Sequence, residues 1–389
     1  MRICKFEIDN FKSLLDFKIE LPKFACLIGL NGSGKSTVLQ AVDFASHLVR
    51  GNVKDWLSQR RWKPSELKSK LSRKLNIEFS ISIEDDNQHP FGTWQGTYSP
   101  TKNRCVKEKL VLPDYSLEIK SDRVFLTKKE TEEAKSREIS FDYQGSILSA
   151  LREEILPPSV RNFKQLLREV KSLDLLSPEH LRQRTRESAG VIGLGGQNLS
   201  AFIHAMKETD REQLVAELRK VYPQLQRMYA RPLRSGWKQI EIVESYHGEE
   251  SGLFPNMTTE SRHVNDGMLR LIAILAELSS NNNLLMFDEI ENGINPELVE
   301  FVIGKLVDAR QQVLVTTHSP IILNYLEDAI AKTGVIYLYK DKHGHTHSIP
   351  FFSIPSLAEK LNVMGPGEAF VDTNLTELAG EIEEFTEVP

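Results

Sequence analysis

Short apolar runs separated by segments of helical spacing fill the second half of the chain, and this pattern predicts an α/β fold. The runs that we expect to form buried strands are residues 284–287, 312–316 and 335–340, together with residues 24–28 near the start. Apolar positions at helical spacing mark residues 264–278, 296–309 and 320–327. Strands that alternate with helices favour a largely parallel core sheet.

Strict alternation of apolar and polar residues predicts another kind of sheet earlier in the chain. Residues 76–83 alternate cleanly, and similar runs continue to residue 142 with turn residues between them. Residues 2–20 carry two apolar clusters, which we interpret as two strands joined by a short connection. Residues 147–230 are mainly helical and lack a sustained heptad repeat. We therefore expect an antiparallel β lobe and an inserted helical lobe beside a mixed core sheet.

The amino-acid composition excludes few classes of protein. The chain has 389 residues, of which 40% are hydrophobic and 26% are charged, as in ordinary globular proteins. No apolar run reaches the length of a membrane span, and the N-terminus lacks the apolar core of a signal peptide. Three scattered cysteines without C-x-x-C spacing argue against a zinc ribbon or disulfide framework and fit a reducing cytoplasm.

The strongest motif is the stretch at residues 29–37, which reads GLNGSGKST and matches G-x-x-x-x-G-K-[ST] in full. An apolar run precedes it and a helical segment follows it, which is the context that a phosphate-binding loop requires. The glycines let several backbone N–H groups converge on one phosphate cluster. We expect Lys35 to reach the β- and γ-phosphates of ATP and Ser36 to hold Mg²⁺. The residues predicted to bind the nucleotide are Asn31, Gly32, Ser33, Gly34, Lys35, Ser36 and Thr37.

Two later strands end in residues that suit the same chemistry. The apolar run at 284–287 is followed by Asp288 and Glu289, the pattern that should accompany a phosphate loop. Asp288 would hold Mg²⁺ at the carboxyl end of the sheet. Glu289 would orient the attacking water or take its proton. The run at 313–317 ends in His318, which we expect to sense the γ-phosphate and to contribute, with Glu289 and Lys35, to catalysis.

Gln144 stands where the predicted β lobe gives way to the helical lobe. A glutamine at such a junction could sense Mg²⁺ and the γ-phosphate, so Gln144 is a predicted metal ligand. Gln95 is the second candidate, and a polar turn residue is the structural alternative.

Residues 52–74 are strongly basic and include Trp56 and Trp62. Basic and aromatic residues together are typical of a surface that binds DNA or RNA. The alternative is a solvated helical segment whose tryptophans dock it on the core. Because the formal net charge of the chain is -5, contact with nucleic acid would need such a local patch.

Taken together, the phosphate loop, Asp288-Glu289 and the strand that ends at His318 resemble the ABC-type ATPase heads of the SMC, RecF and OLD-like branch. The opening sequence IDNFKSL resembles the start of that branch, and VNDGMLRL at 264–271 is similar to the "SDG-x-x-R" signature of prokaryotic defence ATPases. The resemblance implies an α/β P-loop head. The expected parts are residues 1–145 with the β lobe, 146–235 as helical subdomain, 236–375 as the rest of the head and 376–389 as an acidic tail.

The resemblance also implies an assembly. Two heads would pair head-to-tail, as a dimer or within a larger homo-oligomer, around two ATP molecules. Asn265 and Gly267 of one signature would contact the γ-phosphate held by the other head, helped by a helix dipole. The signature serine of the family is replaced here by Asn265, which can still donate a hydrogen bond.

Comparison with the OLD-like group suggests a partner. About 70 residues follow His318, too few for a TOPRIM nuclease domain, and no D-x-D pair stands there. The resemblance therefore implies an ATP-hydrolysing switch of bacterial anti-phage defence that controls a separate nuclease or toxin. The alternative is a RecF-like repair ATPase that binds DNA directly through 52–74. A scaffold with slow turnover and a transporter ATPase are less favoured.

Overall fold

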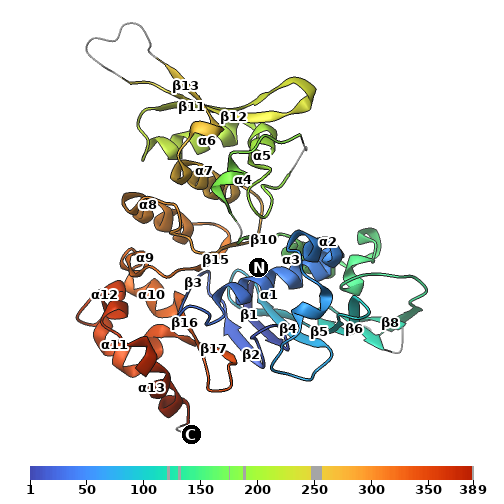
Figure 1. Cartoon of the computed structure of the whole chain (residues 1–389). Helices are drawn as coiled ribbons and strands as arrows, with labels where there is room; N and C mark the ends of the chain where they lie inside the picture. Colours follow the sequence, from blue (N-terminus) through green and yellow to red (C-terminus); the bar gives the residue numbers. More distant parts are fainter. Residues whose placement is uncertain (121–122, 130–132, 175, 187–189, 247–255, 388–389) are drawn as a thin grey trace. The chain divides into compact units, whose positions relative to one another are not determined.

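A computed structural model describes residues 1–120, 123–129, 133–174, 176–186, 190–246 and 256–387 of the chain (Figure 1). These residues form two compact units. Unit 1 consists of residues 1–171 and 312–389, and unit 2 of residues 172–311. Unit 2 is thus an insertion in unit 1. Each unit is described by itself below.

The centre of unit 1 is a mixed sheet with the strand order β15-β3-β16-β17. Its members are β15 (Gln312–Thr316), β3 (Phe24–Ile28), β16 (Val335–Lys340) and β17 (Thr346–Pro350). β3 lies parallel to β15 and to β16, and β17 is antiparallel to β16. Every residue of β3 and β15 is buried, which explains why these two strands read as continuous apolar runs.

An eight-stranded antiparallel sheet forms the second layer of unit 1, in the order β2-β1-β4-β5-β6-β7-β8-β9. Its strands are β1 (Arg2–Asp9), β2 (Phe17–Glu20), β4 (Ile77–Glu84), β5 (Pro90–Ser99), β6 (Arg104–Val111), β7 (Tyr115–Lys120), β8 (Arg123–Lys128) and β9 (Glu133–Glu138). The predicted β lobe is therefore present. β4 alternates buried and more exposed residues along its length, because only one face of the sheet covers the core.

Three helices cover the inner face of this sheet (Figure 1). They are α1 (Lys35–Arg50), α2 (Val53–Gln59) and α3 (Pro158–Arg168). The fully buried ring of Phe44 on α1 meets Tyr98 of β5 edge-on, with ring centroids 5.1 Å apart, and lies 5.6 Å from Trp56 of α2. Trp94 of β5 lies 6.0 Å from Phe163 of α3. Large aromatic rings thus fix these helices on the sheet.

The chain after β15 adds small helices to the same unit. They are α9 (Pro320–Asn324), α10 (Asp328–Gly334), α11 (Pro355–Leu361), α12 (Pro366–Val371) and α13 (Leu375–Glu387). Gln312, at the start of β15, is buried, and its Nε2 donates to the carbonyl oxygens of Ile3, Leu21 and Pro22 at 2.8–3.1 Å. This single amide joins the parallel sheet to the segments that open the antiparallel one.

Unit 2 contains an antiparallel sheet of β11 (Leu225–Pro232), β12 (Lys238–Glu244) and β13 (Met257–Glu260). Its helices are α4 (Pro178–Leu181), α5 (Leu199–Ala205), α6 (Glu208–Arg219), α7 (Asp266–Leu278) and α8 (Pro296–Val307). Figure 1 shows α5 and α6 against this sheet. α7 is the most buried of these helices, with eleven consecutive buried residues from Gly267 to Glu277. The unit also holds the buried strand β14 (Leu284–Phe287).

Several elements differ from the expectation. Residues 170–173 form a strand, β10 (Val170–Leu173), inside the segment 147–230 that was predicted to be mainly helical. β11 and β13 were not predicted. Within the segment 147–230, which was predicted to be mainly helical, α4 is short and ends at Leu181. The two compact units meet along the chain at residues 171 and 311, and the finer division at 145 and 235 stays a prediction.

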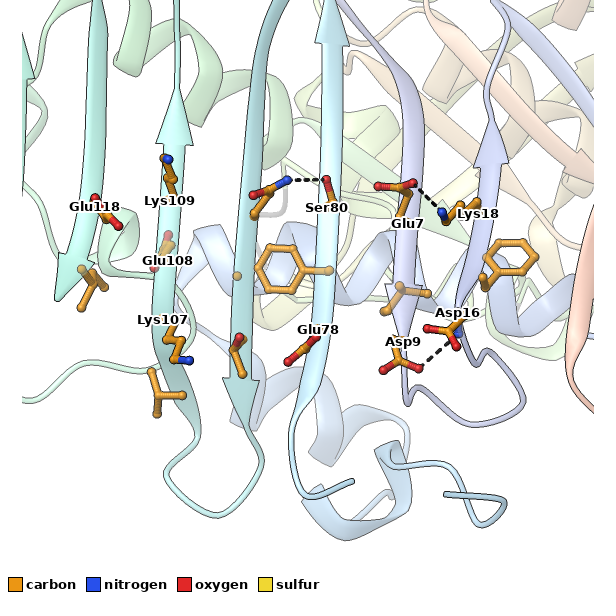
Figure 2. Close-up of a pocket in the computed structure, with 18 of the residues that line it drawn as sticks. Glu7, Asp9, Asp16, Lys18, Glu78, Ser80, Lys107, Glu108, Lys109 and Glu118 are labelled. Carbon is orange, nitrogen blue, oxygen red and sulfur yellow. Dashed lines mark hydrogen bonds and ion pairs between the residues drawn. The ribbon is translucent and has the colours of Figure 1, made fainter. Parts of the chain in front are cut away.

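The outer face of the eight-stranded sheet carries a trough of about 790 Å³ (Figure 2). Acidic side chains such as Glu7 and Glu78 stand on one side of it and Lys107 and Lys109 on the other, as Figure 2 shows. Lys18 Nζ lies 3.8 Å from Glu7 Oε1. The trough is not lined by any residue of the loop at 29–37. Among the helices in the described part of the chain, none has the length and apolar character needed to cross a bilayer.

Candidate nucleotide-binding site

The phosphate-loop motif forms the turn between β3 and α1. Three of its glycines have left-handed backbone conformations, with φ of 145° at Gly29, 78° at Gly32 and 111° at Gly34. A Cβ atom at Gly29 would lie 2.3 Å from the carbonyl oxygen of Leu338, and one at Gly34 would lie 2.7 Å from Thr346 Oγ1. Glycine is therefore required at both positions by backbone conformation and by space.

Lys35 and Ser33 face the inside of this turn. Lys35 is only 5% exposed, and its Nζ donates to the carbonyl oxygens of Gly29 at 2.8 Å and Leu30 at 3.1 Å. Ser33 is buried, and its Oγ has no hydrogen-bond partner among the described residues. A buried hydroxyl without a partner is costly, so the turn contains a donor that suits an added acceptor such as a phosphate oxygen.

Thr346 on β17 forms hydrogen bonds with the phosphate loop and with the segment at Ser13. Its buried Oγ1 donates to the carbonyl oxygen of Ser33 at 3.0 Å and also lies 3.0 Å from Ser13 Oγ. Its backbone N–H donates to the carbonyl oxygen of Ser13 at 3.1 Å. The sequence prediction missed this residue, because nothing in the local pattern around 346 shows that β17 reaches the phosphate loop.

The structure brings His318 to the same sheet edge as the phosphate loop. β15 and β3 are parallel, with Thr316 opposite Leu27, and the N–H of Thr317 donates to the carbonyl oxygen of Leu27 at 3.1 Å. The N–H of Ser319 donates to Thr317 Oγ1 at 2.9 Å. This turn leaves the His318 side chain exposed just beyond the carboxyl end of β15.

Asp288 and Glu289 lie in unit 2, directly after the fully buried strand β14. Glu289 has a left-handed conformation, with φ of 46°. Arg270, which is 7% exposed, donates through Nη2 to the carbonyl oxygens of Asp288 at 3.2 Å and Glu289 at 2.9 Å. Burial lowers the pKa of Arg270, and the nearby acids Glu291, Glu289 and Asp288 counteract this. The guanidinium thus fixes the backbone that carries both carboxylates.

Arg270 was not among the predicted site residues. Its position three residues after Gly267 in "SDG-x-x-R" was the available signal, and the structure shows what the arginine does: it joins the signature helix to the turn after β14. A Cβ at Gly267 would lie 3.0 Å from the carbonyl oxygen of Gly293. Gly267 therefore permits close packing of α7 against the same turn.

Asn265 caps α7. Its Oδ1 accepts a hydrogen bond from the N–H of Met268 at 2.8 Å, which is the contact expected of a good N-cap residue. The side chain is exposed. Because Oδ1 faces the helix, the Nδ2 group is left to face outward. Arg182, also missed by the prediction, supports this loop by donating to the carbonyl oxygen of Val264 at 2.9 Å and pairing with Asp266.

Gln144 is not placed where the prediction put it. Its Oε1 accepts from Asn103 Nδ2 at 3.2 Å and from the N–H of Lys54 at 3.4 Å. Its carbonyl oxygen lies 3.8 Å from the Cβ position of Gly51, the C-cap of α1. A helix of sixteen residues is about 24 Å long, so Gln144 lies a whole helix away from Ser36. Gln144 is therefore corrected from a metal ligand to a residue at the far end of α1. Gln95 lines the sheet trough.

Trp56 is a core residue. It is fully buried, and its Nε1 donates to Asp43 at 2.6 Å, beside an ion pair of Asp43 with Arg60 at 2.9 Å. Burial would raise the pKa of Asp43, but the hydrogen bond and charge of His47 and the charge of Arg60 hold it well below its usual range. Trp62 lies under the ammonium of Lys12, 3.2 Å from its ring centroid. The docking interpretation thus holds for Trp56, which cannot stack on a base.

The residues of the loop fit a bound triphosphate. α1 begins at Lys35 without a side-chain cap and without an acidic residue in its first turn, so its first N–H groups and the positive end of its dipole remain available to an anion. No heavy atom lies within 4 Å of the Cβ position of Gly32. Ser36 is half-buried on the first turn of α1, where its hydroxyl could hold Mg²⁺. A nucleotide–magnesium complex therefore suits this turn.

A phosphate loop, a strand ending in His318 beside it, and a helix capped by Asn265 define the class of fold, which is that of a P-loop head. The chain belongs to the family described as "AAA domain, putative AbiEii toxin, Type IV TA system", whose pattern matches residues 24–324. No curated protein matches the sequence.

One solved structure with a TM-score above 0.5 supports the fold. The chain is similar to the Smc head bound to the C-winged helix domain of ScpA, with 13% identity and a TM-score of 0.56, over 90% of this chain and 97% of that chain. The SMC head domain from Thermotoga maritima has 12% identity over 90% and 99% of the two chains and a TM-score of 0.45. A Pyrococcus furiosus Smc head bound to the C-terminal domain of ScpA has 12% identity over 93% and 99% and a TM-score of 0.48.

Proposed function

We propose that the protein is an ATP-hydrolysing switch whose two copies pair head-to-tail around ATP and Mg²⁺. The observation that carries the proposal is the phosphate cradle of unit 1. Three left-handed glycines, an uncapped helix start and the orphaned hydroxyl of Ser33 meet in one turn. Such a turn has more hydrogen-bond donors than the protein itself satisfies, as an anion site requires.

The side chains divide the chemistry between them. Lys35 leaves the carbonyl oxygens of Gly29 and Leu30 and neutralises the β- and γ-phosphates. Ser36 and Asp288 are the residues that would hold Mg²⁺, which would supply positive charge to the phosphates when bound. Glu289 orients the attacking water and accepts its proton, and His318 donates to the γ-phosphate. Asn31, Gly32, Gly34 and Thr37 complete the contacts of the loop with the nucleotide.

The second copy supplies the signature. Asn265 Oδ1 already accepts the hydrogen bond that caps α7. Asn265 Nδ2 is therefore the group that would donate to the γ-phosphate held by the partner. The start of α7 at Asp266 adds the positive end of a helix dipole. Bound ATP would therefore stabilise the dimer of two heads, and ATP hydrolysis would allow the dimer to dissociate.

We further propose that this cycle controls a separate effector, a nuclease or toxin, in bacterial anti-phage defence. Support comes from the family description, which names a putative toxin and a type IV toxin–antitoxin system. A similar Smc head is described as bound to a second protein, ScpA, so a head of this fold can carry a partner protein. The competing proposal of direct DNA binding through 52–74 loses one of its two aromatic residues, since Trp56 is buried.

Two substitutions test the proposal. Lys35→Ala should abolish ATP binding in calorimetry, because it removes the cation that faces the phosphates. Glu289→Gln should keep ATP binding, stop phosphate release, and shift the protein to an ATP-dependent dimer in light scattering. Lys332→Ala, on an exposed lysine of α10, is the matched control. Unchanged nucleotide binding in Lys35→Ala would refute the site, and a monomer in Glu289→Gln with ATP would refute the pairing.

A further inference from the structure

The far end of α1 carries a second polar pocket, of about 750 Å³, which the ATPase proposal does not use. Arg50, Lys54, Lys102 and Arg104 line it, against a single acid, Asp142. All of these residues belong to unit 1. Four cationic residues and one acid give this pocket a strongly positive field, although the formal net charge of the whole chain is -5.

Gln144 gives the pocket a fixed hydrogen-bond donor. The hydroxyl of the buried Tyr98 donates to Asn103 Oδ1 at 2.6 Å, and Asn103 Nδ2 donates to Gln144 Oε1 at 3.2 Å. The N–H of Lys54 donates to the same oxygen at 3.4 Å. With its oxygen held twice, Gln144 must turn its Nε2 group the other way, and within the described residues that group meets no acceptor. An amide donor is thus oriented by the core and left without a partner.

The cations differ in how they are held. Arg50 is fixed on main-chain oxygens: its Nε and Nη2 donate to the carbonyl oxygen of Arg168 at 3.1 and 2.6 Å, and Nη2 also donates to that of Val170. The Arg104 guanidinium lies over the Tyr143 ring, 5.3 Å from its centroid. Lys54 and Lys102 are exposed at the mouth. The pocket therefore combines two positioned guanidinium groups with two exposed ammonium groups.

We propose that this pocket binds a phosphate group, separately from the nucleotide loop. Lys54, Lys102 and Arg104 neutralise its charge, and Gln144 Nε2 donates to one of its oxygens. A phosphate offers several acceptor oxygens and up to two charges, which suits donors that approach from different sides. A carboxylate offers two oxygens and one charge, and leaves most of these cations unmatched. The phosphate can belong to a nucleic-acid strand or to a small phosphate monoester.

The test uses the full-length Lys35→Ala protein, in which the nucleotide loop no longer contributes. One arm measures a fluorescent single-stranded oligonucleotide without terminal phosphates, by anisotropy at several salt concentrations. The other arm measures inorganic phosphate by calorimetry. The variants are Lys54→Glu/Lys102→Glu and Gln144→Glu, which keeps the oxygen that Asn103 and Lys54 bind but replaces the donor. The control is the double variant Lys332→Glu/Lys342→Glu, on exposed lysines elsewhere in unit 1. It changes the net charge by the same amount as Lys54→Glu/Lys102→Glu.

We expect both pocket variants to weaken binding about tenfold or more in at least one arm, which corresponds to about 1.4 kcal/mol, with little change in the control. A loss in the oligonucleotide arm, with a salt slope lower by about 0.7 for each lost phosphate contact, identifies a strand as the source. A loss for inorganic phosphate alone identifies a monoester. The proposal is overturned if neither probe loses affinity, or if the control loses as much. Retained thermal unfolding temperatures show that the exposed substitutions leave the fold intact.

Discussion

Thr346 Oγ1 donates to the carbonyl oxygen of Ser33 at 3.0 Å, across a sequence separation of 313 residues. Through this bond, β17 fixes the position of Ser33, which lies three residues before Ser36 in the phosphate loop. The contact is buried, so no water replaces it when it is lost. The geometry of the nucleotide loop is therefore set partly by the last strand of the central sheet.

Replacing Thr346 by valine keeps the shape of the side chain and removes its hydroxyl. We expect a loss of about 1–3 kcal/mol in unfolding free energy, because the carbonyl oxygen of Ser33 loses a buried partner. ATP affinity should fall as well, since the loop is less rigid. Urea unfolding and calorimetry measure the two effects. Thr333→Val on an exposed face of α10 is the control; equal ATP affinities in Thr346→Val and the unmodified protein would contradict the prediction.

Arg270→Lys keeps a positive charge but cannot span the carbonyl oxygens of Asp288 and Glu289 with the same planar group. We expect the rate of ATP hydrolysis to fall about tenfold or more, because Glu289 is no longer fixed, while ATP affinity changes little. Steady-state phosphate release gives the rate. Arg310→Lys is the matched control, because Arg310 is exposed and donates to Asn281 Oδ1 and to the carbonyl oxygen of Ser280, away from Asp288 and Glu289 in the sequence.

Asn265 allows the helix cap to be separated from the predicted contact with the partner. Asn265→Asp keeps an oxygen for the N–H of Met268 but removes the Nδ2 donor and adds a negative charge. We expect an unchanged unfolding temperature, because aspartate is as good an N-cap as asparagine, together with loss of the ATP-dependent dimer in the Glu289→Gln background. Asn265→Ser should retain both properties. Light scattering decides, and a stable Asn265→Asp dimer would count against the head-to-tail arrangement.

The buried carboxyl group of Glu108 should make the free energy of unfolding depend on pH. Glu108 is buried on the inner side of β6, and its carboxylate accepts from Trp94 Nε1 at 2.9 Å, from the N–H of Ile147 at 3.0 Å and from Ser146 Oγ. Burial outweighs these donors and raises the pKa of Glu108 from 4.5 to about 7. Between these two values the folded protein retains a proton that the unfolded chain has lost, so the contribution of Glu108 to stability falls as pH rises.

We expect this contribution to change by roughly 3 kcal/mol between pH 4.5 and pH 7 and to stay constant above that range. Urea unfolding at a series of pH values measures it. Glu108→Gln should flatten this part of the curve, because a neutral amide does not titrate. Glu78→Gln, on the exposed face of the same sheet, should leave the slope as it is. An identical slope in Glu108→Gln and the unmodified protein would show that other groups cause it.

The sequence predicted those parts of the site that depend on local pattern. The glycines of the phosphate loop and the buried strands before Asp288 and His318 follow from neighbouring residues. Thr346 and Arg182 act on segments far away in the chain, so their roles could not be deduced from spacing. The prediction for Gln144 was wrong for a related reason. A glutamine in a turn could lie near either end of α1, and only the folded structure shows that Gln144 lies near the C-terminal end, far from the phosphate loop. Trp56 was ambiguous because composition does not distinguish a buried ring from an exposed one.

The insertion of unit 2 into unit 1 has a consequence for the newly made chain. β3 pairs with β15, whose residues follow it by roughly 290 positions. At translation rates of about 5–20 residues per second, β3 would leave the ribosome roughly 15–60 seconds before its neighbour. Throughout that interval the all-apolar strand β3 and its nucleotide loop lack β15, β16 and β17, the other strands of the central sheet of unit 1. A complete central sheet, and with it a supported nucleotide loop, can therefore form only after most of the chain has been synthesised.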